Sequence, residues 1–344
     1  MKQFEWVEVH SASQASTLAS ATVAGAMTTH SGRLGDDGAA VIKAGGIDLL
    51  DLMKGGLIVP KRLVSLRRVD GLNRIVQEED GTLRVGSIVT LAQIAEHAPI
   101  RERYTALANA VEQSASPQIR HVATLGGNLL QRPRCWYFRS SHYQCARKGG
   151  ETCFAFAGEN QYHAIFDHQG CAIVHPSTAA TALVALEARV ELESAGGKKR
   201  EMRLEDFFLL PTTDVHREND LKPGEVLTSI LLPPASPMAR SIHLKQAEKD
   251  SFDWPIADVA VRLELRQSGV CEKASIILGA AAPVPHRARE AEAAVIGQRV
   301  SEQMAKAAGR AALAGAAPLT KNAYKLPIFE TLVRRAILAV AGRA

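Results

Sequence analysis

Four of the five cysteines lie close together in the chain and form its most specific group of chemically active residues. They follow the spacing C-x9-C-x7-C-x17-C and are Cys135, Cys145, Cys153 and Cys171. Four thiolates can hold a tetrahedral zinc ion or a 4Fe–4S cluster. The C-x2–4-C knuckles typical of structural zinc sites are absent, which argues against a zinc ribbon. Reduced thiols without a metal are the third interpretation, and Cys271 lies alone in a strand-like run.

Basic residues are interleaved with these cysteines. They are Arg132, Arg134, Arg139, Arg147 and Lys148. A cluster bound by four thiolates carries net negative charge, so nearby cations would offset that charge and raise its reduction potential. This composition favours a redox site over a set of ordinary core thiols.

Two glycine pairs offer backbone N–H groups to an anion. In the segment 41–54, VIKAGGIDLLDLMK, a strand runs into Gly45–Gly46 and a helix begins directly after it. In the segment 123–131, ATLGGNLLQ, Thr124 and Asn128 flank the second pair. Glycine and the first turn of a helix both suit a phosphate group. Each pair alone also fits a tight turn, but two pairs in one chain indicate a diphosphate held between them.

Other catalytic signatures are missing from the sequence. It contains no GxGxxG, GxxxxGK[ST], GxSxG or HExxH motif and no paired-carboxylate arrangement. Neither a Rossmann nor a Walker-A site is therefore indicated. His163, His168 and His175 have spacings that match no helical metal site, so we interpret them as structural or solvent-exposed residues and not as ligands. Redox chemistry carried by bound cofactors needs no nucleophile from the chain.

Composition excludes several classes of protein. The chain has 344 residues, 46% of them hydrophobic, which predicts two or three domains. Its net charge of +5 comes from scattered residues, so nucleic-acid binding is not expected. No apolar run is long enough to span a membrane, and Glu5 and Glu8 lie where a signal peptide would have its apolar core. A disulfide framework is not expected in such a chain.

Hydrophobic periodicity predicts an alternation of strands and helices in the first 117 residues, with a hairpin at the turn EEDG. The segment 118–178 lacks clear periodicity, which is typical of functional segments in compact proteins. After a linker near residues 235–240 we expect strands at 240–247, 256–266 and 271–279. Helices are expected at 286–297, 301–315 and 327–342.

Several motifs together resemble those of one protein family. They are AGGIDLLDLMK, ATLGGNLLQRPRCWYFR, KGGETC, GENQYHAIF, HPS, LEDFF and LKPGEVLTSI. The chain resembles the FAD-binding medium subunit of the molybdenum hydroxylases, which include xanthine dehydrogenase and carbon monoxide dehydrogenase. RPRCWYFR, KGG and GENQYH resemble the branch that also holds a 4Fe–4S cluster, found in bacterial aldehyde oxidoreductases and hydroxybenzoyl-CoA reductases.

The resemblance implies an α+β architecture. Two α/β subdomains would form a non-Rossmann FAD-binding domain of the MurB and vanillyl-alcohol oxidase type. A C-terminal α+β domain would combine a three-stranded antiparallel sheet with a helical bundle. The implied boundaries are 1–60 for the first subdomain, 61–237 for the second, with the 4Fe–4S loop insert at 132–172, and 238–344 for the last domain.

The resemblance also implies the site residues, position by position. The FAD contacts would be Lys43, Ala44, Gly45, Gly46, Ile47, Asp48, Leu49, Ala115, Thr124, Gly127, Asn128 and Lys245. The cluster ligands would be Cys135, Cys145, Cys153 and Cys171. Two positions depart from the family pattern, because it usually has Thr at Ile47 and Asp at Thr178. Each departure removes a polar contact, so His175 and Thr178 are not assigned to the site.

By this resemblance the chain is the FAD and 4Fe–4S electron-transfer subunit of a heterotrimeric molybdenum-containing, aldehyde oxidase-type hydroxylase. A large subunit would carry the molybdenum cofactor. A small subunit would carry two 2Fe–2S clusters and pass electrons through FAD to an external acceptor. We expect a cytoplasmic protein, or a periplasmic one exported with a partner subunit. The alternatives are a stand-alone flavin oxidase and a non-catalytic, zinc-stabilised interaction module.

Overall fold

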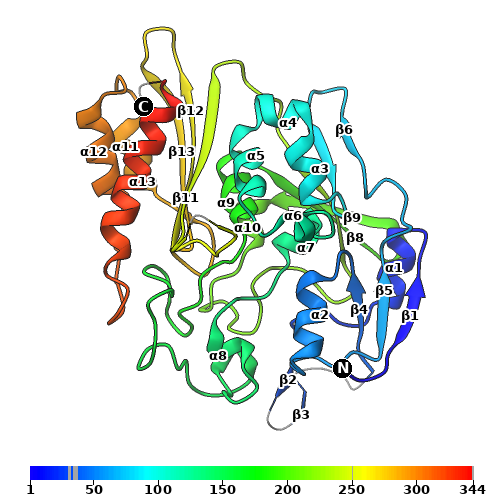
Figure 1. Cartoon of the computed structure of the whole chain (residues 1–344). Helices are drawn as coiled ribbons and strands as arrows, with labels where there is room; N and C mark the ends of the chain where they lie inside the picture. Colours follow the sequence, from blue (N-terminus) through cyan, green and yellow to red (C-terminus); the bar gives the residue numbers. More distant parts are fainter. Residues whose placement is uncertain (30–31, 34–37, 250, 343–344) are drawn as a thin grey trace.

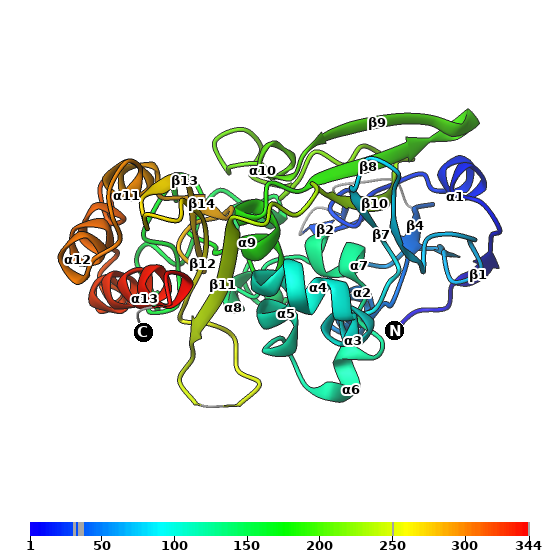
Figure 2. The same ribbon diagram turned by 90° about the horizontal axis from the view of Figure 1, so that it is seen from above.

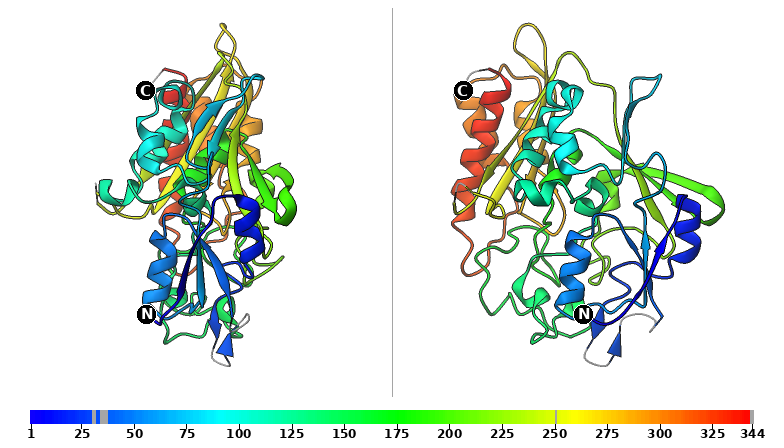
Figure 3. Two further views of the ribbon diagram at one scale, coloured as in Figure 1. Left: turned by 90° about the vertical axis from the view of Figure 1, so that its right-hand side faces the viewer. Right: turned by 45° about the vertical axis from the view of Figure 1, so that its right-hand side comes forward.

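The N-terminal part of the chain is organised by parallel strand pairing. The computed structural model describes residues 1–29, 32–33, 38–249 and 251–342. A three-stranded sheet with the order β1-β5-β4 contains β1 (Glu5–Glu8), β5 (Arg62–Ser65) and β4 (Ala40–Lys43). The helices here are α1 (Ala12–Leu18) and α2 (Ile47–Lys54), and a small antiparallel pair is formed by β2 (Thr28–Thr29) and β3 (Gly32–Arg33). The right-hand view of Figure 3 shows this unit below the central helices.

A second, antiparallel sheet follows, with the order β6-β7-β10-β8-β9. Its strands are β6 (Ile75–Gln77), β7 (Leu83–Gly86), β10 (Val226–Leu232), β8 (Arg189–Ser194) and β9 (Lys198–Arg203), with the short helix η2 (Ala195–Gly197) in the last hairpin. All seven residues of β10 are buried, as its central place requires. The hairpin predicted at EEDG is confirmed, because β6 and β7 pair antiparallel around it.

Helices connect this sheet to the C-terminal sheet. They are α3 (Leu91–Glu96), α4 (Ala98–Arg103), α5 (Thr105–Glu112), α6 (Pro117–Arg120), α7 (Leu125–Leu129), α9 (Thr178–Ala185) and α10 (Leu204–Phe207). Of these, α5 and α9 contact the C-terminal sheet directly. Every residue of α9 is buried. One hydrophobic core joins α9 to Ile230 on β10 and to Ala260 and Ile277 of the next sheet. This core fixes the central helices in place.

The C-terminal part is an antiparallel sheet with helices on its outer face. The strands are β11 (Ala239–Gln246), β12 (Ala257–Leu265), β13 (Cys271–Gly279) and β14 (His286–Arg287), and the helices are α11 (Arg289–Val295), α12 (Glu302–Ala311) and α13 (Lys325–Val340). Figure 2 shows the three helices on one side of this sheet and α5 and α9 on the other. The predicted three strands and three helices are confirmed, and the two-residue β14 is an addition too short for periodicity to reveal.

The segment between α7 and α9 has little regular structure. It contains only α8 (Trp136–Arg139) and η1 (Ala146–Lys148) as helices and lies at the lower left of Figure 1. Residues just before and in α13 hold it to the C-terminal domain. The Asn322 side chain donates to the carbonyl oxygens of His163 and Ala164 at 3.1 and 3.0 Å. In the described part of the chain, no helix is long and apolar enough to cross a membrane.

Lys325 is a fully buried cation at the start of α13. Its Nζ donates to the carbonyl oxygens of Ala280 at 2.5 Å and His163 at 3.1 Å, so it joins the C-terminal sheet to the cysteine-containing segment. Burial lowers the pKa of this amine from 10.5 to about 7, although Asp258 opposes the shift. An amine that loses its proton near neutral pH can still donate both of these hydrogen bonds.

We predict that Lys325 makes the free energy of unfolding rise with pH between about 7 and 10. In that window the unfolded chain binds a proton that the folded chain does not, so raising the pH favours folding by up to about 1 kcal/mol per unit. Lys325→Met should remove this slope, and Lys306→Met, at an exposed position on α12, should keep it. Urea unfolding at several pH values measures both, and equal slopes in the two variants would contradict the prediction.

Candidate functional site: two adjoining cavities

The larger cavity has a volume of about 510 Å³ and lies where the N-terminal sheet meets the central helices and the start of the C-terminal domain. All twelve residues predicted to contact FAD line it. They are Lys43, Ala44, Gly45, Gly46, Ile47, Asp48, Leu49, Ala115, Thr124, Gly127, Asn128 and Lys245. The fold therefore brings together residues that are separated by up to two hundred positions in the sequence. Their individual roles remain predictions.

The first glycine pair forms one wall of this cavity. A Cβ on Gly45 would lie 2.2 Å from the carbonyl oxygen of Val122, so only glycine allows the two loops to approach this closely. Gly46 has φ of +87° and stands at the N-cap of α2 without a side-chain cap. The first N–H groups of α2 are thus left available at the positive end of the helix dipole, which suits an anionic ligand.

The second glycine pair forms the opposite wall. The Thr124 hydroxyl accepts a hydrogen bond from the backbone N–H of Gly127 at 3.2 Å. A Cβ on Gly126 would lie 2.9 Å from Ser87, which again leaves room for no side chain. The hydroxyl of Ser177 donates to Oδ1 of Asn128 at 2.5 Å and so fixes the amide. Ser177 was not predicted from the sequence, although it lies within the HPS motif.

Lys245 and Ala115 lie near the other end of the cavity. The Lys245 Nζ donates to the carbonyl oxygens of Gln113 at 2.8 Å and Asp253 at 2.9 Å, which ties β11 to the loops on both sides. Ala115 has φ of +50°, and its carbonyl oxygen accepts from Arg120 at 2.8 Å. Hydrogen bonds within the protein therefore hold both residues in place without a ligand.

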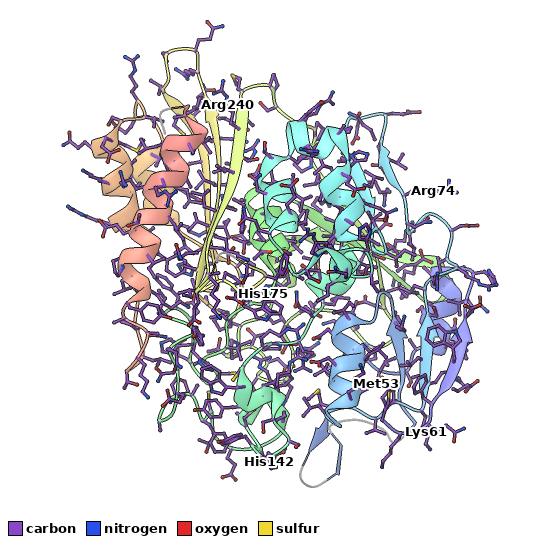
Figure 4. The ribbon with its side chains drawn as sticks, viewed as in Figure 1. Met53, Lys61, Arg74, His142, His175 and Arg240 are labelled. Atoms are coloured by element: carbon purple, nitrogen blue, oxygen red, sulfur yellow. The ribbon has the colours of Figure 1, made fainter. Side chains whose placement is uncertain are left out.

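The two positions that depart from the family pattern differ in their surroundings. Ile47 lines the cavity and is 40% exposed. Thr178 also lines the cavity but is buried, and its hydroxyl lies 2.6 Å from that of Ser114. His175 is fully buried against Phe208, and burial lowers its pKa to about 3, so it is a neutral structural residue. Figure 4 shows His175 in the interior, where the chain returns to α9.

A second, much smaller cavity contains the cysteines. All four predicted ligands, Cys135, Cys145, Cys153 and Cys171, line a space of about 10 Å³ together with Arg147 and His163. Each of the four is a free thiol. His142, which follows α8, lies on the periphery of the same region in Figure 4. Among the described residues, no group of three or more His, Cys, Asp or Glu side chains is placed so that it could hold a metal ion.

The thiols have unequal acidities. Burial raises the pKa of Cys135 to about 12 and also raises that of Cys145. The pKa of Cys171 is lowered, because its sulfur accepts a hydrogen bond from Cys153 and faces the guanidinium of Arg147. The Arg147 Nε donates to this sulfur at 3.5 Å. The cavity thus favours a thiolate at Cys171.

His163 contacts the site directly. Its Nε2 lies 3.2 Å from the sulfur of Cys135, and burial lowers its pKa to about 4. A neutral imidazole in this position can donate a hydrogen bond to a thiolate. The spacing of the histidines in the sequence did not predict this contact, because Cys135 lies twenty-eight residues before His163.

One buried carboxylate stands between the two cavities. Glu218 forms an ion pair with Arg132 Nε at 2.9 Å and accepts a hydrogen bond from Arg147 Nη1 at 2.5 Å. Arg132 and Glu218 line the larger cavity, and Arg147 lines the smaller one. Glu218 was not predicted as a site residue, because no motif near it in the sequence indicates that it pairs with distant arginines.

Asp48 makes a second connection between the two regions. Its carboxylate accepts from the backbone N–H of Arg132 at 2.8 Å and from Arg139 at 2.6 Å, and it pairs with Arg134 at 2.9 Å. These partners offset the negative charge of the Asp48 carboxylate. The first turn of α2 therefore remains suitable for an anion. The predicted FAD contact at Asp48 therefore has a structural role as well.

Comparisons with known proteins agree with this architecture. Residues 2–235 match the model of the FAD binding domain in molybdopterin dehydrogenase, and residues 242–340 match that of the CO dehydrogenase flavoprotein C-terminal domain. The aldehyde oxidoreductase FAD-binding subunit PaoB of Escherichia coli is 34% identical over 304 residues, 88% of this chain and 90% of that protein. The carbon monoxide dehydrogenase medium chain of Hydrogenophaga pseudoflava is 26% identical over 317 residues, 91% and 92% of the two chains.

A solved structure shares the fold. It is that of the Hydrogenophaga pseudoflava carbon monoxide dehydrogenase that lacks the Mo-pyranopterin moiety of the molybdenum cofactor. The likeness has a TM-score of 0.74 at 24% identity and covers 100% of this chain and 99% of that chain. Fold and sequence matches together define an FAD-binding oxidoreductase subunit. The chain belongs to the FAD-binding medium subunits of the molybdenum hydroxylase family.

We predict that Gly45→Ala destabilises the chain and weakens FAD binding. The new methyl group would overlap the Val122 carbonyl oxygen, and the resulting backbone shift should cost about 1–3 kcal/mol. Gly55→Ala at the other end of α2 is the control, because the nearest atom to its Cβ would be 3.5 Å away. Denaturant unfolding and flavin content per polypeptide measure the effects. Equal stability and flavin content in the two variants would refute the prediction.

Proposed function

We propose that the chain is the FAD and 4Fe–4S electron-transfer subunit of a heterotrimeric, molybdenum-containing hydroxylase of the aldehyde oxidase type. Electrons from 2Fe–2S clusters of a small partner subunit would reach FAD here and leave to an external acceptor. The observation that carries this proposal is the pair of adjoining cavities. One is lined by all twelve residues implied for FAD, and the other by four cysteines.

The larger cavity fits the diphosphate and ribityl parts of FAD in its chemistry. The close approaches at Gly45 and Gly126 leave no room for side chains, and the first turn of α2 presents free backbone donors. These features suit a phosphate group that touches the backbone. We infer that the loop 43–49 holds the diphosphate from one side, and that Thr124, Gly127 and Asn128 close the site from the other.

The smaller cavity fits a 4Fe–4S cluster in its donor set. It offers four thiols, and Nη2 of the buried Arg147 has no hydrogen-bond partner among the residues that the structure describes. Each cysteine of such a cluster binds a different iron, so the ligands lie farther apart than around one ion. Because the space between the thiols is only about 10 Å³, they would have to move outward to hold the cluster.

When bound, FAD exchanges electrons singly or in pairs, and an iron–sulfur cluster exchanges them singly. The chain's own residues would bind and orient these groups and keep water out of the smaller cavity. Cys145 and Cys171 are buried, and Phe138 and Tyr137 cover the space between the thiols. The absence of a base for substrate in the sequence argues against a stand-alone oxidase.

The partners and compartment follow from the same proposal. A large subunit with the molybdenum cofactor would oxidise the substrate, and the relative from Escherichia coli, named as an aldehyde oxidoreductase subunit, supports an aldehyde. The complex would assemble in the cytoplasm and either stay there or be exported with a partner.

We also propose a division into three units. The C-terminal unit would begin near residue 238, and the cysteine-containing insert would span 132–172. The first unit would extend through β5, beyond the boundary expected at residue 60, because β5 pairs with both β1 and β4. The second unit would then run from there to residue 237.

Anaerobic purification of the complex, followed by iron, zinc and flavin analysis, tests the proposal. We predict that Cys145→Ser loses the iron of this subunit and keeps most of the FAD, because Cys145 lines only the smaller cavity. Cys271→Ser is the matched control, since this buried thiol lies on β13, away from both cavities.

Each outcome decides one part of the proposal. About four irons and one FAD in the wild-type subunit would support it. Zinc in place of iron would overturn the cluster, and flavin-free protein would overturn the electron-transfer role. If Cys145→Ser lost iron and FAD together, the two sites would not be independent. Oxidation of a small substrate by the isolated chain would instead support the flavin oxidase.

A further inference from the structure

The wall between the two cavities is built from charged side chains that water does not reach. Arg132 and Arg147 are each 1% exposed, and Glu218 is 4% exposed. Glu218 extends one carboxylate oxygen to each arginine, at 2.9 and 2.5 Å. A single anion is therefore shared by one cation that faces the larger cavity and one that faces the cysteines.

We propose that Glu218 couples the two redox centres electrostatically and sets the reduction potential of both. It acts as a positioning residue through Arg132 on the flavin side and through Arg147 on the cluster side. This inference rests on the proposed function, because it requires FAD in the larger cavity and an iron–sulfur cluster in the smaller one.

The buried charges support this assignment. Lys148, which is 2% exposed, adds a third cation, so three buried cations face one buried anion in this wall and its surroundings. Nη1 of Arg132 and Nη2 of Arg147 have no hydrogen-bond partner within the described residues. The excess positive charge and these unused donors match a negatively charged cluster on one side and an anionic ligand on the other.

Further contacts of both arginines hold the triad in place. Arg132 packs over the ring of Phe138 at 4.9 Å, and its Nη2 donates to the carbonyl oxygen of His216 at 2.9 Å. Arg147 donates to the sulfur of Cys171. In a dry and rigid environment a unit charge acts over longer distances than in water.

A negative charge fixed between two redox centres opposes the arrival of an electron at either one. Glu218 thereby lowers both reduction potentials, and Arg132 and Arg147 raise the potential of the centre that each one faces. The carboxylate would keep both centres able to pass electrons onward, since neither would retain an electron too strongly.

The test is Glu218→Gln in the purified complex, with the potentials of cluster and flavin measured by spectroelectrochemical titration. Loss of the anion leaves both guanidinium charges unopposed, so both potentials should rise. At a fixed potential near the midpoint, the ratio of reduced to oxidised cluster should increase about tenfold. Glu159→Gln is the control, because it removes an equal charge from an exposed position of the cysteine-containing segment.

A second variant guards against a failure of Glu218→Gln to fold. Arg147→Gln/Glu218→Gln removes one cation and the anion together, so it adds no net charge to the interior. Arg132 then stands alone beside the flavin, and the cluster loses its nearest cation. The flavin potential should rise and the cluster potential should fall, which a general loosening of the structure would not produce.

The outcomes separate this inference from the proposed function. Wild-type protein without iron or FAD would refute the proposed function itself. Iron and FAD at full content, with potentials unchanged in Glu218→Gln, would overturn the coupling. A shift confined to one centre would make Glu218 a local counter-ion of that centre and would equally overturn the coupling. Shifts of the same sign in the double variant would also contradict the inference.

Discussion

The arrangement of this molecule depends on a buried carboxylate that is shared by two buried guanidinium groups. Glu218 offsets the buried charges of Arg132 and Arg147, because an unpaired buried charge costs several kcal/mol. Removing one partner of such a group typically costs about 3–5 kcal/mol. The loop that carries Glu218 must therefore lie against the cysteine-containing segment. This requirement positions a segment that has almost no helix or strand of its own.

The same logic explains how close the two cavities can be. Asp48 belongs to the first turn of α2 at the larger cavity, yet it binds the backbone of Arg132 and the side chain of Arg139. The chain between Asn128 and Cys135 is thus fastened at its middle, with one end in each cavity. The wall between the two cavities is thus held by ion pairs and not by hydrophobic packing.

Local patterns in the sequence predicted much of the fold and singled out the two glycine pairs and the four cysteines. The other residues of the larger cavity were implied only by the family resemblance. The glycine pairs could be recognised because only glycine meets the backbone requirements of such positions. The C-terminal strands and helices could be recognised from their clear periodicity. Periodicity did not fix the helix ends in the first 117 residues, where α4 and α5 meet at Tyr104 and α1 ends at Leu18. Long-range partners could not be predicted. The cations around the cysteines were evident, but Glu218 lies seventy-one residues from Arg147 and no local signal joins them.

The cysteine-containing segment also depends on the domain farthest from it in sequence. Lys325 and Asn322 both donate to the carbonyl oxygen of His163, and the ring of His163 contacts the sulfur of Cys135. A displacement at the start of α13 would therefore move a side chain of the smaller cavity. Because Glu218 holds the same cavity from the opposite side, the cysteines are fixed by two parts of the chain that share no sheet. A loop without regular structure can thus hold four thiols in one place, since its order comes from its partners and not from its own backbone pattern.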